Sequence, residues 1–278
     1  MKAPAYAKVN LTLEVLGRRD DGYHALRSVV QPISLADELE LTEADGISCD
    51  SGYEDDLCVK AARTLARVSG VTRGVRISVK KRIPVGGGLG GGSADAAAVL
   101  VALDEMWKLG KSRRELAEIG AAVGSDVPAL VLGDTVLMEG RGEKVSLLAG
   151  DVAFPRLFMV LANPGVFCST AGVFSACTPR LHGDGSILYN MTNALRSGDW
   201  RKVADATMND LEVPASALHP EISAVLGALK AAGVRGVSMS GSGSTVFGFV
   251  PDEARGREIA ALMNAEGYWA ESVHTIVR

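Results

Sequence analysis

Residues suited to binding phosphate are concentrated in one glycine-rich stretch between positions 84 and 94. Six of the seven residues from Gly86 to Gly92 are glycine, so backbone N–H groups there can approach a ligand without interference from a Cβ atom. Those groups add to the unpaired N–H donors and the positive dipole end of the helix expected to follow, a combination that favours phosphate. We therefore predict a nucleotide triphosphate loop. Its predicted cofactor-binding residues are Pro84, Val85, Gly86, Gly87, Gly88, Leu89, Gly90, Gly91, Gly92, Ser93 and Ala94.

Two familiar phosphate-binding templates fit this stretch poorly. The dinucleotide pattern G-x-G-x-x-G is met by Gly86, Gly88 and Gly91, but a stretch with so many glycines satisfies almost any glycine template. The P-loop pattern is not met, because no lysine precedes Ser93. A flexible linker is the remaining alternative. It is disfavoured because linkers are usually polar on both sides, whereas this stretch joins an apolar strand to an apolar helix.

A lysine, an amide and an acid elsewhere in the chain are candidates for chemistry beside such a loop. Lys8 and Asn10 lie on the same face of an alternating, half-buried strand over residues 7–15, because side chains two apart point the same way. For an isolated lysine, a solvated strand face is the more frequent explanation. Asp126 lies in the corner Ser125–Pro128, where it is either a turn former or a functional acid. The residues alone leave both alternatives open.

Strands and helices in an α+β pattern must position these residues. An alternating strand at Val75–Val79 precedes the glycine-rich stretch, and a helix at Ala96–Leu103 follows it. A second loop, Ser240–Thr245, contains glycine and serine and lies between apolar strands at Val237–Met239 and Val246–Val250. Because both flanking strands must pack, this second loop is not a linker either.

The composition is that of an ordinary globular enzyme, with 47% hydrophobic and 22% charged residues among 278. A net charge of −4 and only 5% aromatic residues argue against nucleic acid or an anionic membrane as a partner. The four cysteines form no C-x-x-C pair, so neither zinc nor disulfides are indicated and a reducing, cytoplasmic setting is expected. We expect no signal peptide, no membrane span and no obligate protein partner.

Five segments, taken together and in this order, resemble the GHMP kinase superfamily, whose members phosphorylate small metabolites with ATP. The segments are Ala7–Leu11, Gly17–His24, Gly86–Ser93, Gly124–Pro128 and Ser240–Gly243. The run Asp-Gly-Tyr-His that ends at His24 is much more specific than either glycine loop. It is similar to the corresponding run in the members of the family that act on a branched tetritol linked to cytidine diphosphate.

The resemblance implies a fold of two lobes, with an N-terminal half like ribosomal protein S5 and a C-terminal half like ferredoxin. We place these lobes at residues 1–150 and 151–278. The resemblance also implies ATP and Mg²⁺ as cofactors, and phosphorylation of the 2-hydroxyl of the cytidylyl tetritol in the non-mevalonate isoprenoid pathway. The segment Pro179–Gly185, rich in Pro, Gly and Asp, is expected to be a mobile loop.

Carried over residue by residue, the resemblance implies a catalytic pair of Lys8 and Asp126. Asp126 would orient the acceptor hydroxyl and accept its proton late, while Lys8 would lie near the transferring phosphoryl group. Ser93, at the start of the helix, would offer its hydroxyl to Mg²⁺. The substrate-binding residues implied are Asn10 at the sugar-alcohol end, Tyr23 and Phe174 on the two faces of the cytosine ring, His24 at its edge and Thr170 beside the same pocket.

Three other functions agree less well with these residues. A sister kinase acting on homoserine or mevalonate is disfavoured by Tyr23 and His24, and a non-catalytic nucleotide sensor would be expected to have lost Lys8 or Asp126. A Rossmann-type dehydrogenase is disfavoured because the glycine-rich stretch does not lie in the first βαβ unit. The basic cluster of Lys80, Lys81 and Arg82 either attracts phosphate to the loop or is a solvated strand end.

Overall fold

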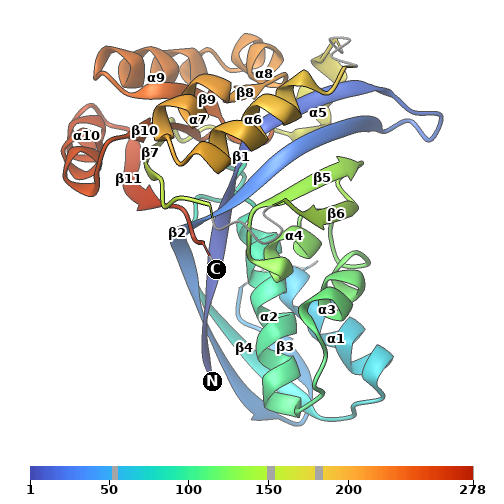
Figure 1. Ribbon diagram of the computed structural model, residues 1–278. Helices are drawn as coiled ribbons and strands as arrows, with labels where there is room; N and C mark the ends of the chain where they lie inside the picture. Colours follow the sequence, from blue (N-terminus) through green and yellow to red (C-terminus); the bar gives the residue numbers. More distant parts are fainter. Residues whose placement is uncertain (52–55, 149–153, 179–183, 278) are drawn as a thin grey trace. The chain divides into compact units, whose positions relative to one another are not determined.

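The computed structural model describes residues 1–51, 56–148, 154–178 and 184–277 (Figure 1). By packing, the chain divides into two compact units, each made of three segments. The first unit contains Met1–Ala7, Leu35–Pro84 and Gly90–Gly133, and the second contains Lys8–Ser34, Val85–Leu89 and Asp134–Arg278. The long strands β1 (Lys2–Arg18) and β2 (His24–Ala44) run through both.

The predicted division into lobes after residue 150 differs from the division into the two compact units. Residues 149–153, in which that boundary falls, lie outside the described residues. The two packing units instead share the N-terminal strands and the glycine-rich stretch. The division into 1–150 and 151–278 therefore stays a prediction about domains.

Strand pairs and packed helices form the first unit. Strand β4 (Gly74–Lys80) pairs antiparallel with the end of β2, and β3 (Ile47–Cys49) pairs in parallel with β4. Helix α1 packs on α2, and α2 also contacts α3 and α4 (Figure 1). The bounds of these helices are α1 (Leu57–Ser69), α2 (Gly91–Trp107), α3 (Arg113–Gly120) and α4 (Val127–Leu132).

Local sequence explains where these helices begin. Asp56 caps α1 by accepting from the Val59 N–H, and Ser112 with Glu115 forms a reciprocal capping box at α3. The pair Asp55-Asp56 before Leu57, and Ser112 before Arg113, predict these two helix starts, and the structure confirms Asp56 and Ser112 as caps. Asp55 lies outside the described residues. Helix α2 is apolar on most of its circumference and is buried, as expected for a helix surrounded by other elements.

A four-stranded antiparallel sheet with the order β11-β7-β10-β9 is the centre of the second unit. Helix α10 packs against this sheet. The hydrophobic core of the second unit includes the apolar face of α9, which carries Ile222, Val225, Leu226 and Leu229. The strands and helices from residue 158 onward are β7 (Phe158–Asn163), α5 (Thr170–Ala176), α6 (Ser186–Ser197), α7 (Trp200–Ala206), β8 (Met208–Asn209), α8 (Glu212–Leu218), α9 (Pro220–Ala231), β9 (Arg235–Met239), β10 (Val246–Val250), α10 (Glu253–Ala265) and β11 (Trp269–His274).

The run Gly140-Arg141-Gly142 between Val136–Met138 and Lys144–Leu148 predicts a hairpin, which the structure confirms. Strand β5 (Val136–Gly140) pairs antiparallel with β6 (Lys144–Leu147) and with the first half of β2. The alternating run through Val29, Val30 and Ile33 and the short apolar run Leu39–Leu41 predict separate strands, whereas one strand of 21 residues, β2, contains both.

The expectation of a half-buried first strand is wrong. Lys8 and Asn10 are only 4% and 5% exposed, and Thr12 and Glu14 on the same face are also buried. Polar partners replace water there, because the Asn10 side chain donates to the Ser28 hydroxyl, which itself donates to the Thr12 carbonyl. The solvated-lysine explanation of Lys8 is thereby excluded.

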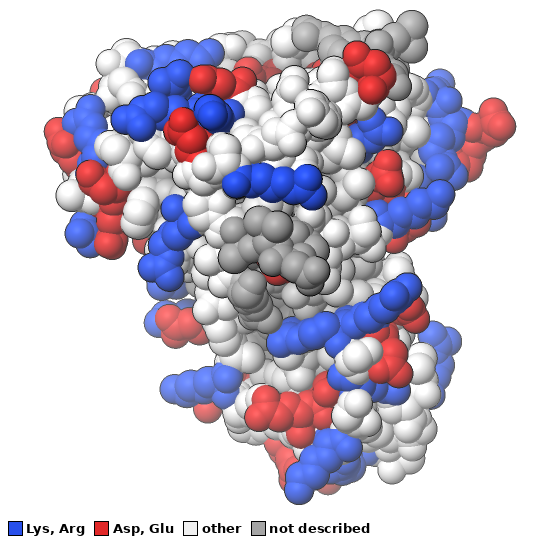
Figure 2. Space-filling view, in the orientation of Figure 1, with Lys and Arg blue, Asp and Glu red and all other residues white. Residues whose placement is uncertain are grey.

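No helix among the described residues is both long and apolar enough to cross a membrane. Figure 2 shows Lys and Arg side chains mixed with Asp and Glu over the visible face, consistent with the small net charge of −4. Residues 179–183 of the loop expected to be mobile lie outside the described part of the chain.

Candidate active site

Lys8 is held in the interior of the second unit by oxygen acceptors. Its ammonium nitrogen Nζ donates to Asn10 Oδ1 at 2.7 Å and to the Gly88 carbonyl at 2.8 Å. Its backbone N–H donates to the Leu89 carbonyl at 3.1 Å. A buried ammonium is costly unless such acceptors replace its water. The strand-borne lysine is therefore fixed against the glycine-rich stretch, as its predicted role requires.

The glycine-rich stretch and the late loop Ser240–Thr245 are hydrogen-bonded to each other. The Gly87 carbonyl accepts from the Thr245 N–H at 3.1 Å, and the Gly88 carbonyl accepts from the Ser240 hydroxyl at 3.0 Å. Gly88 has φ of +76°, and a Cβ atom there would lie 2.1 Å from the Ser240 carbonyl oxygen. Only glycine permits this approach. The structure thus brings together three features that the sequence had only placed in order along the chain.

Helix α2 begins earlier than the sequence indicated. Its N-cap is Gly90, in the left-handed region, and the helix starts at Gly91 and not near Ala96. The last four residues of the predicted loop, 91–94, are therefore the first turn of the helix. Among the residues that the structure describes, no side chain caps this end, and no acidic residue lies in its first turn. The N–H groups of that turn are oriented as a phosphate site requires.

Ser93 and the Asp126 corner are neighbours in the first unit. Ser93 Oγ lies 3.8 Å from the position that a Cβ atom on Gly124 would occupy, two residues before Asp126. Asp126 is half-buried at the N-cap position of α4, and its side chain does not cap the helix. The role of Asp126 as a functional acid stays a prediction. Lys8 belongs to the other unit, so its pairing with Asp126 stays a prediction.

The predicted acceptor residues form two groups in the second unit. The rings of His24 and Phe174 pack with centroids 5.4 Å apart and planes tilted by 31°. Tyr23 is exposed, and the guanidinium carbon of Arg141 lies 5.0 Å from the centroid of its ring. The ring found beside Phe174 is thus that of His24, and the cytosine sandwich between Tyr23 and Phe174 stays a prediction.

Thr170 also contacts the late loop. Its hydroxyl lies 3.0 Å from the Ser242 hydroxyl, and Ser169 caps the short helix α5 that carries Thr170 and Phe174. The sequence reasoning missed Phe167, an exposed ring that packs on Gly86, where a Cβ atom would lie 2.5 Å from the ring. An exposed aromatic residue three positions after the Asn163-Pro164 turn was the available signal.

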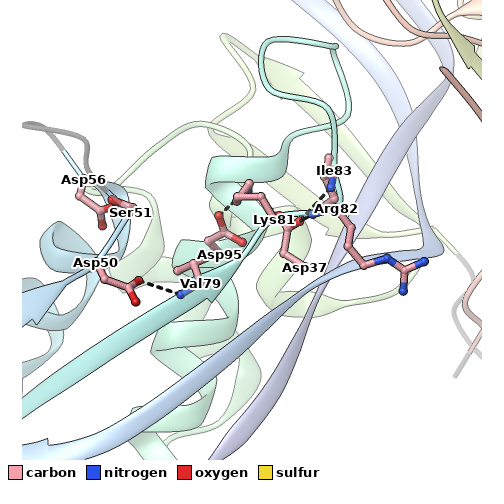
Figure 3. Close-up of polar contacts among 9 residues, drawn as sticks. All are labelled: Asp37, Asp50, Ser51, Asp56, Val79, Lys81, Arg82, Ile83 and Asp95. Atoms are coloured by element: carbon pink, nitrogen blue, oxygen red, sulfur yellow. Dashed lines mark hydrogen bonds and ion pairs between the residues drawn. The ribbon is translucent and has the colours of Figure 1, made fainter. Parts of the chain in front are cut away.

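A buried cluster beside the glycine-rich stretch was also missed. Figure 3 shows Lys81 reaching between Asp37 and Asp95, with Nζ 2.5 Å from Asp37 Oδ2 and 2.7 Å from Asp95 Oδ2. Asp37 Oδ1 accepts the backbone N–H groups of Arg82 and Ile83 at 2.5 and 2.8 Å. Asp37 therefore fixes the turn that leads into Pro84. The Lys81 ammonium is thus paired with two buried carboxylates. The only ion pair of Lys80 among the described residues is with Glu38, and it is exposed.

Two carboxyl groups share one ammonium in this cluster. Burial raises the pKa of Asp95 to about 7, with Lys81 opposing that shift. Burial opposes the charge of Lys81, but the hydrogen bonds that its ammonium donates to Asp37 and Asp95 prevail and raise the pKa of Lys81. Asp95 Oδ1 is buried with no hydrogen-bond partner in the described part of the chain. A single acid within the apolar run after the glycines was the signal for this cluster.

Comparison with known proteins identifies the family. Residues 56–134 match the GHMP kinases N terminal domain, and residues 191–268 match the GHMP kinases C terminal domain. These two matches cover more than half of the chain. The chain belongs to the GHMP kinase family.

This GHMP kinase has relatives of similar length. It is 43% identical to 4-diphosphocytidyl-2-C-methyl-D-erythritol kinase from Pelotomaculum thermopropionicum, over 93% of this chain and 92% of that protein. It is 41% identical to the protein of the same name from Bacillus cytotoxicus, over 92% and 89% of the two chains.

Solved structures match this GHMP kinase over nearly its whole length. A crystal structure of 4-(cytidine 5'-diphospho)-2C-methyl-D-erythritol kinase matches with a TM-score of 0.83 at 35% identity, over 99% of each chain. A homoserine kinase from Cytophaga hutchinsonii shares the fold, with a TM-score of 0.78 at 18% identity over 100% of this chain and 95% of that one. The predicted α+β GHMP kinase fold is confirmed.

Proposed function

We propose that this GHMP kinase transfers the γ-phosphoryl group of ATP to the 2-hydroxyl of 4-diphosphocytidyl-2-C-methyl-D-erythritol, a step of the non-mevalonate isoprenoid pathway. The observation that carries the proposal is the identity of about 40% over more than nine-tenths of the chain to kinases of that name. The homoserine kinase match, at 18% identity, bears on the fold alone.

The contacts in the second unit support the binding of a triphosphate. The carbonyls of Gly87 and Gly88 are occupied by Thr245, Ser240 and Lys8, which holds the loop in one conformation. Preorganised N–H donors lose little entropy when an anion binds, so a fixed loop suits a reaction that depends on positioning. The positive charge of Lys8 would stabilise the negative charge on the phosphoryl group in the loose transition state.

Asp126 and Ser93 supply the remaining proposed roles from the first unit. Asp126 would orient the acceptor hydroxyl and accept its proton late in the transfer. Mg²⁺ in such enzymes is held by one or two protein oxygens together with phosphate oxygens and water, and the Ser93 hydroxyl at the uncapped end of α2 fits that requirement. When bound, the ion neutralises charge on the phosphates.

The acceptor end is assigned to residues of the second unit. Phe174 and Tyr23 would stack on the cytosine, His24 would bind its edge, Asn10 would contact the tetritol and Thr170 would lie beside the ring. The exposed face of Tyr23 and the packed pair of His24 with Phe174 support an aromatic site. Each base–aromatic contact contributes about 1–3 kcal/mol. We further propose a cytoplasmic protein that needs no nucleic acid, membrane or obligate protein partner.

A coupled assay of ADP release tests the proposal. The alcohols to compare are 4-diphosphocytidyl-2-C-methyl-D-erythritol, the same tetritol phosphate without the cytidylyl group, homoserine and mevalonate. Turnover with the cytidylyl compound alone is expected. Turnover with homoserine or mevalonate would assign the chain to a sister kinase, and nucleotide binding without turnover of any alcohol would indicate a sensor.

A further inference from the structure

Two thiols from separate elements lie together in the first unit. Cys49 is the last residue of β3 and Cys58 is the second residue of α1. Their sulfur atoms and a carboxylate oxygen of Asp56 all lie within 4.8 Å of one another. The two thiols share a hydrogen bond. No short cysteine motif announces this pair, because the packing of β3 against α1 creates it.

The two thiols have different environments. Cys58 is 3% exposed, whereas Cys49 is only half-buried. The hydrogen bond from Cys58 lowers the pKa of Cys49, which favours its thiolate form. The same hydrogen bond, together with burial, raises the pKa of Cys58. An accessible thiol with a lowered pKa beside a buried thiol is the arrangement required for thiol–disulfide exchange followed by internal resolution.

Asp56 is already engaged elsewhere. Its Oδ1 accepts the Val59 N–H at 2.9 Å and so caps α1, and its Oδ2 accepts the Ser51 hydroxyl. Figure 3 shows Ser51 and Asp56 side by side near the strand that bears Val79. A metal held by the two thiols and this carboxylate would compete with the helix cap. Disulfide formation needs no ligand from Asp56.

We propose that Cys49 and Cys58 are a reversible dithiol–disulfide pair, oxidised by low-molecular-weight disulfides such as oxidised glutathione. The Cys49 thiolate attacks one sulfur of the external disulfide, forms a mixed disulfide and releases the first thiolate. The Cys58 thiol then loses its proton, its sulfur attacks the Cys49 sulfur, and the second thiolate leaves with that proton. The protein loses two electrons and the external disulfide is reduced to two thiols.

The bond would act on the glycine-rich stretch through α1. The sulfur atoms must approach to about 2.05 Å, which moves the first turn of the helix. Leu57, next to Cys58, lies against that stretch, since a Cβ atom on Gly92 would be 3.6 Å from Leu57 Cδ1. Oxidation therefore alters the support of the first turn of α2, where the proposed function places the phosphates. A severalfold higher KM for ATP is expected in the oxidised protein.

Peptide mapping by mass spectrometry under non-reducing conditions tests the bond itself. The full-length protein is equilibrated with a series of reduced and oxidised glutathione mixtures and then acid-quenched. The expected product joins the peptides of Cys49 and Cys58, and dithiothreitol reverses it. Cys168→Ser, which alters a buried cysteine of the second unit, is the matched control and should still form the bond. Free thiols at both positions in every mixture would overturn the proposal.

Two single variants test the order of attack. Cys58→Ser should trap glutathione on Cys49, and Cys49→Ser should leave Cys58 unmodified because that thiol is buried. Circular dichroism establishes that each variant is folded before it is compared. Modification of Cys58 in the Cys49→Ser variant would contradict the assignment of Cys49 as the attacking thiol.

Zinc and ATP measurements separate the remaining outcomes. If one equivalent of Zn²⁺ alone blocks oxidation of both thiols, the cluster is a metal site and the redox proposal is wrong. The predicted change in KM rests on the proposed kinase function, whereas the peptide map does not. If the disulfide forms and the KM for ATP is unchanged, the redox pair is confirmed and its proposed effect on the glycine-rich stretch is wrong.

Discussion

Gly88→Ala is expected to destabilise the second unit and abolish turnover. The new Cβ atom would lie 2.1 Å from the Ser240 carbonyl oxygen, against an ordinary contact of at least 3.4 Å, so the backbone must separate by about 1.3 Å. That movement breaks the bonds that the Gly88 carbonyl accepts from Lys8 Nζ at 2.8 Å and from Ser240 Oγ at 3.0 Å.

The magnitude follows from these contacts. A left-handed alanine costs about 1–2 kcal/mol. A hydrogen bond to a charged donor contributes about 1.5–3 kcal/mol and a neutral one about 0.5–1.5 kcal/mol. The total loss for Gly88→Ala is about 3–6.5 kcal/mol, a large part of the 5–15 kcal/mol typical of a folded protein.

Gly198→Ala is the matched control. Gly198 also has a positive φ, of +70°, but a Cβ atom there would meet nothing within 4 Å. It should lose only about 1–2 kcal/mol from the backbone conformation. Urea unfolding followed by circular dichroism measures both losses, and ADP release measures turnover. Equal losses in the two variants would refute the close approach of Gly88 to Ser240.

Three further predictions concern single side chains. Asp126→Asn should reduce turnover by orders of magnitude while ATP binding, measured by calorimetry, persists; unchanged turnover would remove Asp126 from the mechanism. Tyr23→Ala should raise KM for the cytidylyl substrate with little effect on KM for ATP, and equal effects would contradict stacking. Burial raises the pKa of Asp95 to about 7, above about 3.9 in the unfolded chain, so the stability contributed by its protonated form is lost as pH rises from about 4 to about 7. Asp95→Asn should flatten that part of the pH profile of urea midpoints, whereas the exposed Asp45→Asn should not; parallel profiles would count against a protonated Asp95.

Local patterns predicted most of the elements that the structure contains. Caps at Asp56 and Ser112, the hairpin around Gly140 and the strands on either side of Ser240–Thr245 depend on nearest neighbours along the chain. Such features are set by turn chemistry and side-chain periodicity, which a sequence displays directly.

Features that depend on tertiary packing were not predictable in the same way. Alternation at Lys8 and Asn10 indicated a solvated face, but that face is covered and its polar groups pair with one another. The start of α2 was placed too late, because glycine is a poor helix former and only the left-handed cap at Gly90 reveals the true beginning. The Lys81 cluster joins residues from three separate segments, so no local pattern contains it.

The bonds from Ser240 and Thr245 to the glycine-rich stretch have a consequence for biosynthesis. Gly87 and Gly88 leave the ribosome roughly 150 residues before the partners that fix them, and domains fold as the chain is made, at about 5–20 residues per second. For many seconds the nascent chain therefore carries this stretch with Lys8 already present but without the hydrogen bonds from Ser240 and Thr245. Phosphate binding should consequently appear only near the end of translation, and ribosome-bound chains that stop before residue 240 should not retain ATP.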